Sequence, residues 1–266
     1  MMANEYSIDA HQSIAAITGE ERRGDVRSLV GPYDLATLVQ STDAADGQTV
    51  DAFLYEIGEP ELRHVTKVGG LPYWPSDSPW PTCLGPDKPK NARFFPPKGT
   101  PAVFLGQICF GNSKDITGEL PSDVLLLFVE DETFLRVHFE WQPLGITNLI
   151  HTKDVPNPSF EFGTCFGHRV RIPDPASNEK ARRIAATKIG GEPQLIQSPR
   201  NAGGKFLCQL SSFQPTLECP FPFVDHPEPI TLDDDEWNCQ LSMVDMGNLY
   251  IYLNENGECE YSFDSH

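Results

Sequence analysis

The chain has 266 residues, of which 39% are hydrophobic, enough to bury a sizeable core in one large domain or two small ones. Its 38 acidic residues outnumber its 20 basic ones, and the formal net charge is −18. This excess argues against direct binding to nucleic acid or to an anionic membrane surface. There is no long apolar run and no secretion signal at the start, so we expect a soluble, cytoplasmic protein.

Common catalytic and metal-binding motifs are missing from the sequence. The seven cysteines include no Cys-x-x-Cys pair, no His-x-x-x-His occurs, and Gly203-Gly204-Lys205 is followed by Phe206 rather than by the hydroxyl residue of a phosphate loop. The nucleophile elbow and the dinucleotide fingerprint do not occur either. We therefore expect a protein that is not an enzyme and that holds no metal and no cofactor.

Residues 1–61 form an acidic N-terminal segment, with 11 acids and 3 bases in residues 1–60. A helix is predicted at residues 25–40, although Pro32 interrupts it. Proline-rich, aromatic loops follow at 71–81, 94–101, 172–177 and 219–229, and a second helix is predicted at 174–187, where Pro175 suits the first turn.

Short runs of β-branched and aromatic residues, bounded by turn residues, predict most of the secondary structure. The expected strands lie at 103–110, 124–130, 134–141, 206–210, 248–253 and 258–263. Residues 254–257, Asn-Glu-Asn-Gly, predict a hairpin turn because Asn and Gly tolerate positive φ.

The sequence contains an internal duplication. Residues 66–72, Thr-Lys-Val-Gly-Gly-Leu-Pro, return at 187–193 as Thr-Lys-Ile-Gly-Gly-Glu-Pro. The block 104–108 returns at 206–210, each with a central Gln, and 126–129 is matched with 249–252. The order is kept in both halves. We expect an α+β fold of internally duplicated, mostly antiparallel repeats with a few helices, packed as one globular unit: a first repeat at 62–150, a connecting segment with a helix at 151–186, and a second repeat at 187–266.

Over residues 62–266 these blocks, together with Trp80-Pro81 and the closing Gly247-x-Leu-Tyr-x-Tyr252, resemble the YwqG-like family of bacterial domains of unknown function. The resemblance implies an α+β fold with internal duplication and carries no catalytic residues over to this chain. It also implies an association with bacterial competition, because some members accompany toxins delivered by secretion systems. Residues 209–212 read Gln-Leu-Ser-Ser where the family has an acidic residue.

Residues 206–266 hold 12 acids and no Lys or Arg. We expect their carboxylates and one tryptophan to form a surface for a basic protein partner, with charge steering the encounter and the aromatic ring anchoring it. The candidate partner-binding residues are Asp233, Asp234, Asp235, Glu236, Trp237, Glu255 and Glu258. A solvated loop or a calcium site over 233–236 is the alternative.

With the family association, this charge predicts an immunity protein, or antitoxin. It would neutralise a toxin, such as a secreted nuclease, by covering its basic active-site groove, and would be a monomer or weak homo-oligomer. The alternative is a small-ligand or peptide binding protein with a cleft between the repeats. That cleft would be lined by Tyr73, Trp74, Trp80, Gln107 and Gln209. The same glutamines also suit buried strand ends, where each amide satisfies backbone groups.

Overall fold

The computed structural model describes residues 7–8, 48–86, 95–131, 134, 136–158, 162–174, 176, 186–197, 203–212, 241, 243 and 247–265. The helix predicted at 25–40 and nearly all of the one predicted at 174–187 lie outside these residues. The acidic run Asp233–Trp237 lies outside them as well.

The chain divides into two compact units, each assembled from separate segments. Unit 1 comprises residues 1–57, 112–120 and 167–266, and unit 2 comprises residues 58–111 and 121–166. The sequence led us to expect continuous repeats at 62–150 and 187–266. Instead, a short segment inside the expected first repeat belongs to unit 1.

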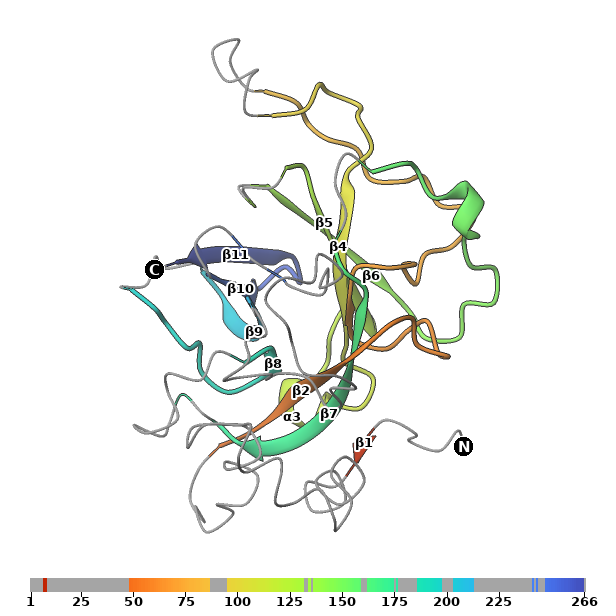
Figure 1. The fold of residues 1–266 in the computed structure, drawn as a ribbon. Coiled ribbons are helices and arrows are strands. Elements are labelled where there is room, and N and C mark those ends of the chain that lie inside the picture. The colour runs from red at the N-terminus through yellow and green to blue at the C-terminus, as the bar shows by residue number, and fades with distance from the viewer. Residues whose placement is uncertain are drawn as a thin grey trace, which may run out of the picture. The chain divides into compact units, whose positions relative to one another are not determined.

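Unit 2 is built on an antiparallel sheet in the order β7-β3-β4-β5-β6 (Figure 1). Only the first two residues of β7 belong to this unit. A 3-10 turn, η2 (Thr152–Asp154), lies in the loop that follows β6. The strands are β3 (Lys67–Val68), β4 (Val103–Cys109), β5 (Val124–Val129), β6 (Val137–Gln142) and β7 (Cys165–Pro173).

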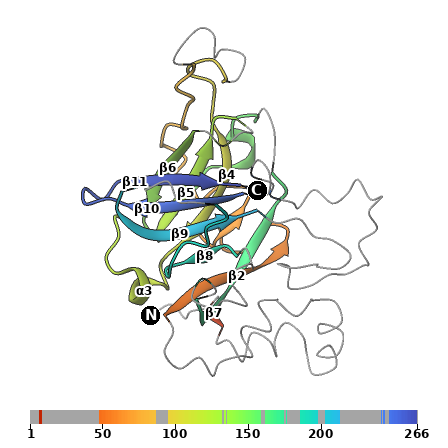
Figure 2. The same cartoon turned by 90° about the vertical axis from the view of Figure 1, so that its left-hand side faces the viewer.

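Unit 1 has the strand order β11-β10-β9-β8-β2-β7 (Figure 2). β1 pairs with β7 in parallel. A four-residue helix, α3 (Lys114–Thr117), belongs to the 112–120 segment. The other strands are β1 (Ser7–Ile8), β2 (Thr49–Ile57), β8 (Lys188–Ile189), β9 (Lys205–Ser211), β10 (Asn248–Leu253) and β11 (Cys259–Asp264).

The expected mostly antiparallel β-structure is confirmed, with β4, β5, β6, β9, β10 and β11 at the predicted places. The hairpin turn is also confirmed: the Asn254 N–H donates to the Glu258 carbonyl at 3.0 Å, and Gly257 has φ +78°. The helical half of the α+β expectation is not confirmed, because the helices bounded within the described residues are the four-residue α3 and the three-residue η2. Buried, β-branched and aromatic runs such as β5 favour strands.

Each unit contains a β-bulge at the equivalent position of its repeat. In β4, Leu105 has no partner on β5, because Phe104 pairs with Phe128 and Gly106 with Leu127. In β9, Leu207 is skipped in the same way, because Phe206 pairs with Tyr252 and Cys208 with Ile251. A bulge leaves the extra residue without a partner on the bulged side of the strand. On the other side, the Leu105 and Leu207 carbonyls bond to the residues that follow β3 and β8.

Strand register corrects one detail of the expected repeat. Gln107 on β4 lies opposite Leu126, whereas Gln209 on β9 lies opposite Tyr250. The structural match of Leu126 is therefore Tyr250, one residue later than the sequence match with Leu249. A one-residue slip would place each side chain on the wrong face of the sheet.

The core of unit 2 packs aromatic and aliphatic side chains on one face of β4 and β5. Rings meet edge to face, with Trp74 and Trp80 centroids 5.4 and 5.2 Å from that of Phe128. Burial also raises the pKa of the Cys83 thiol to about 11, which suits an unreactive cysteine in the core.

The Gly69–Gly70 turn depends on close backbone approach as well as on positive φ. Gly69 has φ +61°, and a Cβ there would lie 2.5 Å from the Phe162 carbonyl oxygen. Gly145 has φ +89°, but nothing lies within 4 Å of a Cβ there. A comparison of Gly69 with Gly145 therefore separates the cost of positive φ from the cost of a steric clash.

We expect Gly145→Ala to lower the free energy of unfolding by about 1–2 kcal/mol, the cost of a left-handed residue with a Cβ. Gly69→Ala should cost clearly more, because the new methyl group also collides with a backbone carbonyl. Urea unfolding of both variants tests this. Equal losses would contradict the close approach.

Candidate functional site

A buried lysine organises the turn that follows β3 in unit 2. The Lys67 side chain is fully buried, and its ammonium donates to the Leu71 carbonyl and to Glu59 Oε2, the latter at 3.1 Å. The other Glu59 oxygen accepts the Leu71 N–H at 2.6 Å. One carboxylate thus holds both the lysine and the backbone after Gly70.

Gln107 joins this turn to the core. Its Nε2 donates to the carbonyls of Arg63 and Val65 at 2.7 and 2.8 Å, and its Oε1 accepts the Tyr73 N–H at 2.9 Å. The Leu105 carbonyl accepts the Gly69 N–H at 2.9 Å, which continues the pairing of β3 with β4 by one residue. These bonds tie the turn to β4.

Unit 1 contains the same network around Lys188. Its ammonium donates to Asp174 Oδ1 and, at 2.5 Å, to the Glu192 carbonyl, while Asp174 Oδ2 accepts the Glu192 N–H at 2.7 Å. Gln209 accepts the Gln194 N–H and donates to the Ala186 carbonyl.

The Gly-Gly turn repeats as well. The Leu207 carbonyl at the second bulge accepts the Gly190 N–H at 2.9 Å, the distance found between Leu105 and Gly69. Burial lowers the pKa of both Lys67 and Lys188, and the neighbouring carboxylates oppose this shift.

The two carboxylates differ in exposure. The Asp174 side chain is 1% exposed, whereas that of Glu59 is 46% exposed. Asp174 also accepts the Ala176 N–H at 3.0 Å, so this buried carboxylate has three protein donors. Glu59 forms part of the wall of a cavity instead.

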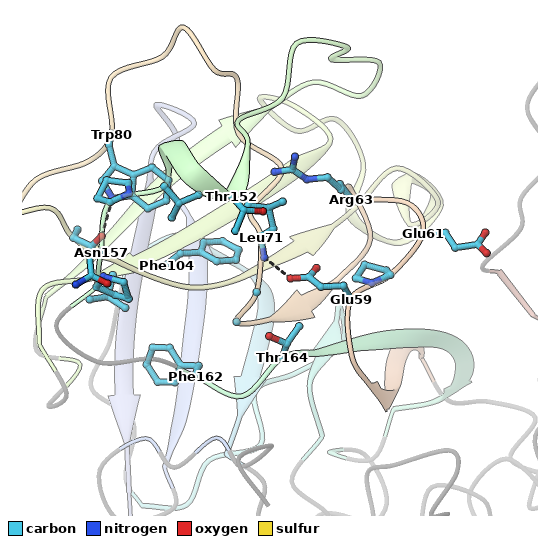
Figure 3. A pocket seen from close by; sticks show the side chains of 18 residues that line it. Glu59, Glu61, Arg63, Leu71, Trp80, Phe104, Thr152, Asn157, Phe162 and Thr164 are labelled. Atoms are coloured by element: carbon cyan, nitrogen blue, oxygen red, sulfur yellow. Dashed lines mark hydrogen bonds between the residues drawn. The ribbon is translucent and has the colours of Figure 1, made fainter. Parts of the chain in front are cut away.

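That cavity lies within unit 2 and has a volume of about 730 Å³ (Figure 3). Volumes of about 300–1,000 Å³ are usual for small-molecule sites. Its walls come from the loop after β2, the Gly-Gly turn, Trp80, the start of β4 and the loop before β7. The lining residues are Glu59, Pro60, Glu61, Arg63, Gly69, Gly70, Leu71, Trp80, Ala102, Val103, Phe104, Thr152, Val155, Pro156, Asn157, Pro158, Phe162 and Thr164.

Three aromatic rings line the cavity and are held in place by their neighbours. Trp80 Nε1 donates to the Ala102 carbonyl at 2.8 Å, which fixes the indole (Figure 3). Phe104 belongs to the core cluster. The Phe162 ring lies 5.9 Å from that of Phe134, a buried residue whose φ of +56° is rare for a bulky side chain.

The charged side chains on the cavity wall have different roles. The Arg63 guanidinium donates to the carbonyls of Ile150, at 2.7 Å, and Pro72, and so ties two loops together. In Figure 3 the Glu59 carboxylate is turned towards Leu71, whereas Glu61 points away from the other labelled side chains. Burial lowers the pKa of Arg63.

The structure brings one of the five residues of the expected ligand cleft to this cavity, namely Trp80. Tyr73 and Trp74 are each 3% exposed and pack in the core of unit 2. Gln107 and Gln209 are buried, and their amides satisfy backbone groups, as in the alternative interpretation of the sequence. Apart from Trp80, the cavity is therefore lined by residues that the sequence did not suggest.

Two residues of the expected acidic surface are described, and both are exposed on the hairpin between β10 and β11. Glu255 lies in the turn and Glu258 follows it. The Asn254 side chain orders this turn by accepting the N–H groups of Asn256 and Glu258 at 3.0 and 2.9 Å. The other expected partner-binding residues, at 233–237, lie outside the described residues.

Sequence reasoning missed Glu59, one of the two glutamates that line the cavity. A signal existed, since an acid precedes both Thr-Lys-x-Gly-Gly blocks, but the spacing hides it: Glu59 is 8 residues before its lysine and Asp174 is 14 before its own.

Among the described residues, no group of three or more His, Cys, Asp or Glu side chains is arranged to hold a metal ion. No helix within the same residues has the length and apolar character needed to cross a membrane. No protein-family model matches the chain, and no curated protein matches it either. The resemblance to the YwqG-like family stays a prediction.

The two lysine networks predict different costs when the ammonium is removed. Lys188→Met leaves the buried Asp174 carboxylate without its partner, and we expect a loss of about 3–5 kcal/mol in the free energy of unfolding. Lys67→Met should cost less, because water reaches Glu59. Urea unfolding of both variants checks the order, and a larger loss for Lys67→Met would contradict it.

Proposed function

We propose that this protein acts by binding rather than by catalysis, and that the cavity of unit 2 receives a small ligand or a peptide segment. The cavity itself carries the proposal: it is large enough for a ligand, it is walled by aromatic and proline side chains, and a few polar groups are fixed around it. This keeps the ligand-binding alternative from the sequence but moves it from a cleft between repeats into one unit.

We infer that both Gly-Gly turns belong to one duplicated structural repeat. The shared bulge, the shared glutamine bonds and the shared lysine–carboxylate pair support this inference. In one copy the carboxylate is enclosed. In the other it borders the cavity, so the ligand-binding role is assigned to the unit 2 copy.

A variant that fills the cavity tests the binding function. Thr152 is exposed and lines the cavity, so Thr152→Trp should obstruct it without disturbing the core. Lys153 is also exposed, follows directly in η2 and does not line the cavity, and Lys153→Trp is the matched control.

In a ligand-observed NMR screen of a fragment library, we expect fragments that bind the wild type and Lys153→Trp but lose most of their signal with Thr152→Trp. Absence of binders, or binders unaffected by Thr152→Trp, would count against a ligand site in this cavity.

A second candidate function is that of a cytoplasmic immunity protein that covers a basic toxin. Its support is the charge of residues 206–266, with 12 acids and no Lys or Arg, together with the exposed Glu255 and Glu258. A field of one sign raises the rate of encounter with an oppositely charged partner by about 10–1000-fold and weakens with salt. In this function a basic toxin or effector is the partner.

The immunity function predicts a salt-sensitive complex. A pull-down from the native organism should recover a basic protein that high salt releases. Reversing the charges of Asp233, Asp234 and Asp235, or of Glu255 and Glu258, should slow association in stopped-flow measurements, whereas Asp77→Lys in unit 2 should not. Association rates independent of salt and of these reversals would exclude the acidic surface as the contact.

A further inference from the structure

We propose that the ligand of the unit 2 cavity is a protonated amine attached to an apolar group. This inference rests on the ligand-binding function proposed above and names the chemistry that the cavity recognises. It follows from which hydrogen-bonding groups of the wall are already used and which have capacity left.

The donors nearest the carboxylate are committed to protein acceptors. Lys67 is fully buried, and its ammonium bonds to Glu59 and to the Leu71 carbonyl. The terminal nitrogens of Arg63 donate to the Ile150 and Pro72 carbonyls. Arg63 Nε has no hydrogen-bond partner among the described residues but is buried, as is the Lys67 ammonium, so an anionic ligand in the cavity does not reach these donors.

Glu59, in contrast, has acceptor capacity. Each of its oxygens accepts one bond, from Leu71 N–H and from Lys67, and a carboxylate oxygen has a second lone pair. The side chain is 46% exposed and already held in one orientation by two bonds, so little freedom is lost when a ligand donates to it.

The Gly-Gly turn of unit 1, whose carboxylate is buried, serves as a comparison for Glu59. Asp174 has the same two partners, a lysine and the backbone N–H after the Gly-Gly turn, and a further bond from the Ala176 N–H. With its side chain 1% exposed, it serves the turn alone. Glu59 has one more methylene than Asp174, and its carboxylate faces the cavity as well as the turn.

The aromatic walls suit the rest of the ligand. Trp80, Phe104 and Phe162 offer apolar surface for the ligand body, and a cation near an aromatic face gains a further attraction. An ammonium next to an apolar group therefore matches both the carboxylate and the rings. The amine can come from a free small molecule or from a lysine side chain of a peptide.

The test compares three probes of nearly one shape by isothermal titration calorimetry on the full chain: phenethylamine, 2-phenylethanol and 3-phenylpropanoate. We expect phenethylamine to bind at least about tenfold more tightly than the alcohol, because a hydrogen bond between charged groups is stronger than a neutral one. The carboxylate should bind most weakly. The wild-type protein suffices for this comparison, so it does not depend on a variant that folds.

Variants then locate the preference. Glu59→Gln should remove the advantage of the amine over the alcohol, whereas Asp77→Asn, which removes a charge from an exposed loop outside the cavity, should keep it. Thr152→Trp should abolish binding of the amine. Nα-acetyl-lysine N-methylamide and its norleucine analogue, which lacks the ammonium, test the same preference for a peptide. Tighter binding of phenethylamine would indicate a small molecule as the source of the amine, and tighter binding of the lysine derivative would indicate a peptide.

The outcomes separate the two proposals. Binding of all three probes with equal affinity, lost in Thr152→Trp, would overturn the amine inference and leave the ligand cavity standing, as would tightest binding of the carboxylate. Probe binding that Thr152→Trp does not change, or no binding of any probe, would overturn both.

Discussion

The rest of each unit depends on a fully buried lysine whose ammonium must be compensated. Burying an uncompensated cation is very costly, so the turn beside it supplies a backbone carbonyl and a carboxylate supplies the opposite charge. For the carbonyl to reach the ammonium, the chain must reverse tightly, which requires two consecutive glycines with positive φ. A ladder bond to Leu105 or Leu207 and the bonds of the buried glutamine then fasten this turn to the neighbouring strand.

The same constraint supports the ligand-binding role proposed for the cavity of unit 2. Once a lysine, a turn and a carboxylate are fixed together, the carboxylate is held rigidly whether or not it is covered. In unit 1 it is covered and serves stability alone. In unit 2 it borders a cavity, and a group kept in place by the fold becomes a preorganised acceptor at no extra cost in ordering.

The sequence predicted those parts of the fold that local patterns encode. Repeated Gly-Gly blocks and alternating aromatic strands were recognisable because the bonds of a turn and the faces of a strand follow short sequence rules. The long strands β2 and β7 were missed, since one was counted with the acidic N-terminal segment and the other with the connecting segment. Both supply the carboxylates, Glu59 and Asp174, from residues just beyond their ends.

The cavity could not be predicted because its walls come from distant segments. Trp80 was expected to line a cleft between the repeats and lines a cavity within unit 2 instead, whereas Tyr73 and Trp74, only a few residues earlier, face the core. Neighbouring aromatic residues in a proline-rich loop have no fixed period that would tell an inward side chain from an outward one. The cavity wall around Glu59 likewise includes residues from 152–158 and 162–164, a placement that no local pattern encodes.

The discontinuous make-up of the units has a consequence for synthesis. Unit 2 has all its residues once Phe166 has been made, whereas β2 of unit 1 ends at Ile57 and must wait for its antiparallel partner β8, which ends at Ile189. At about 5–20 residues per second, the stretch between the two strands takes the ribosome roughly 7–26 s. During that interval β2 is a nine-residue strand without its antiparallel partner, and a nascent chain is open to mispairing there.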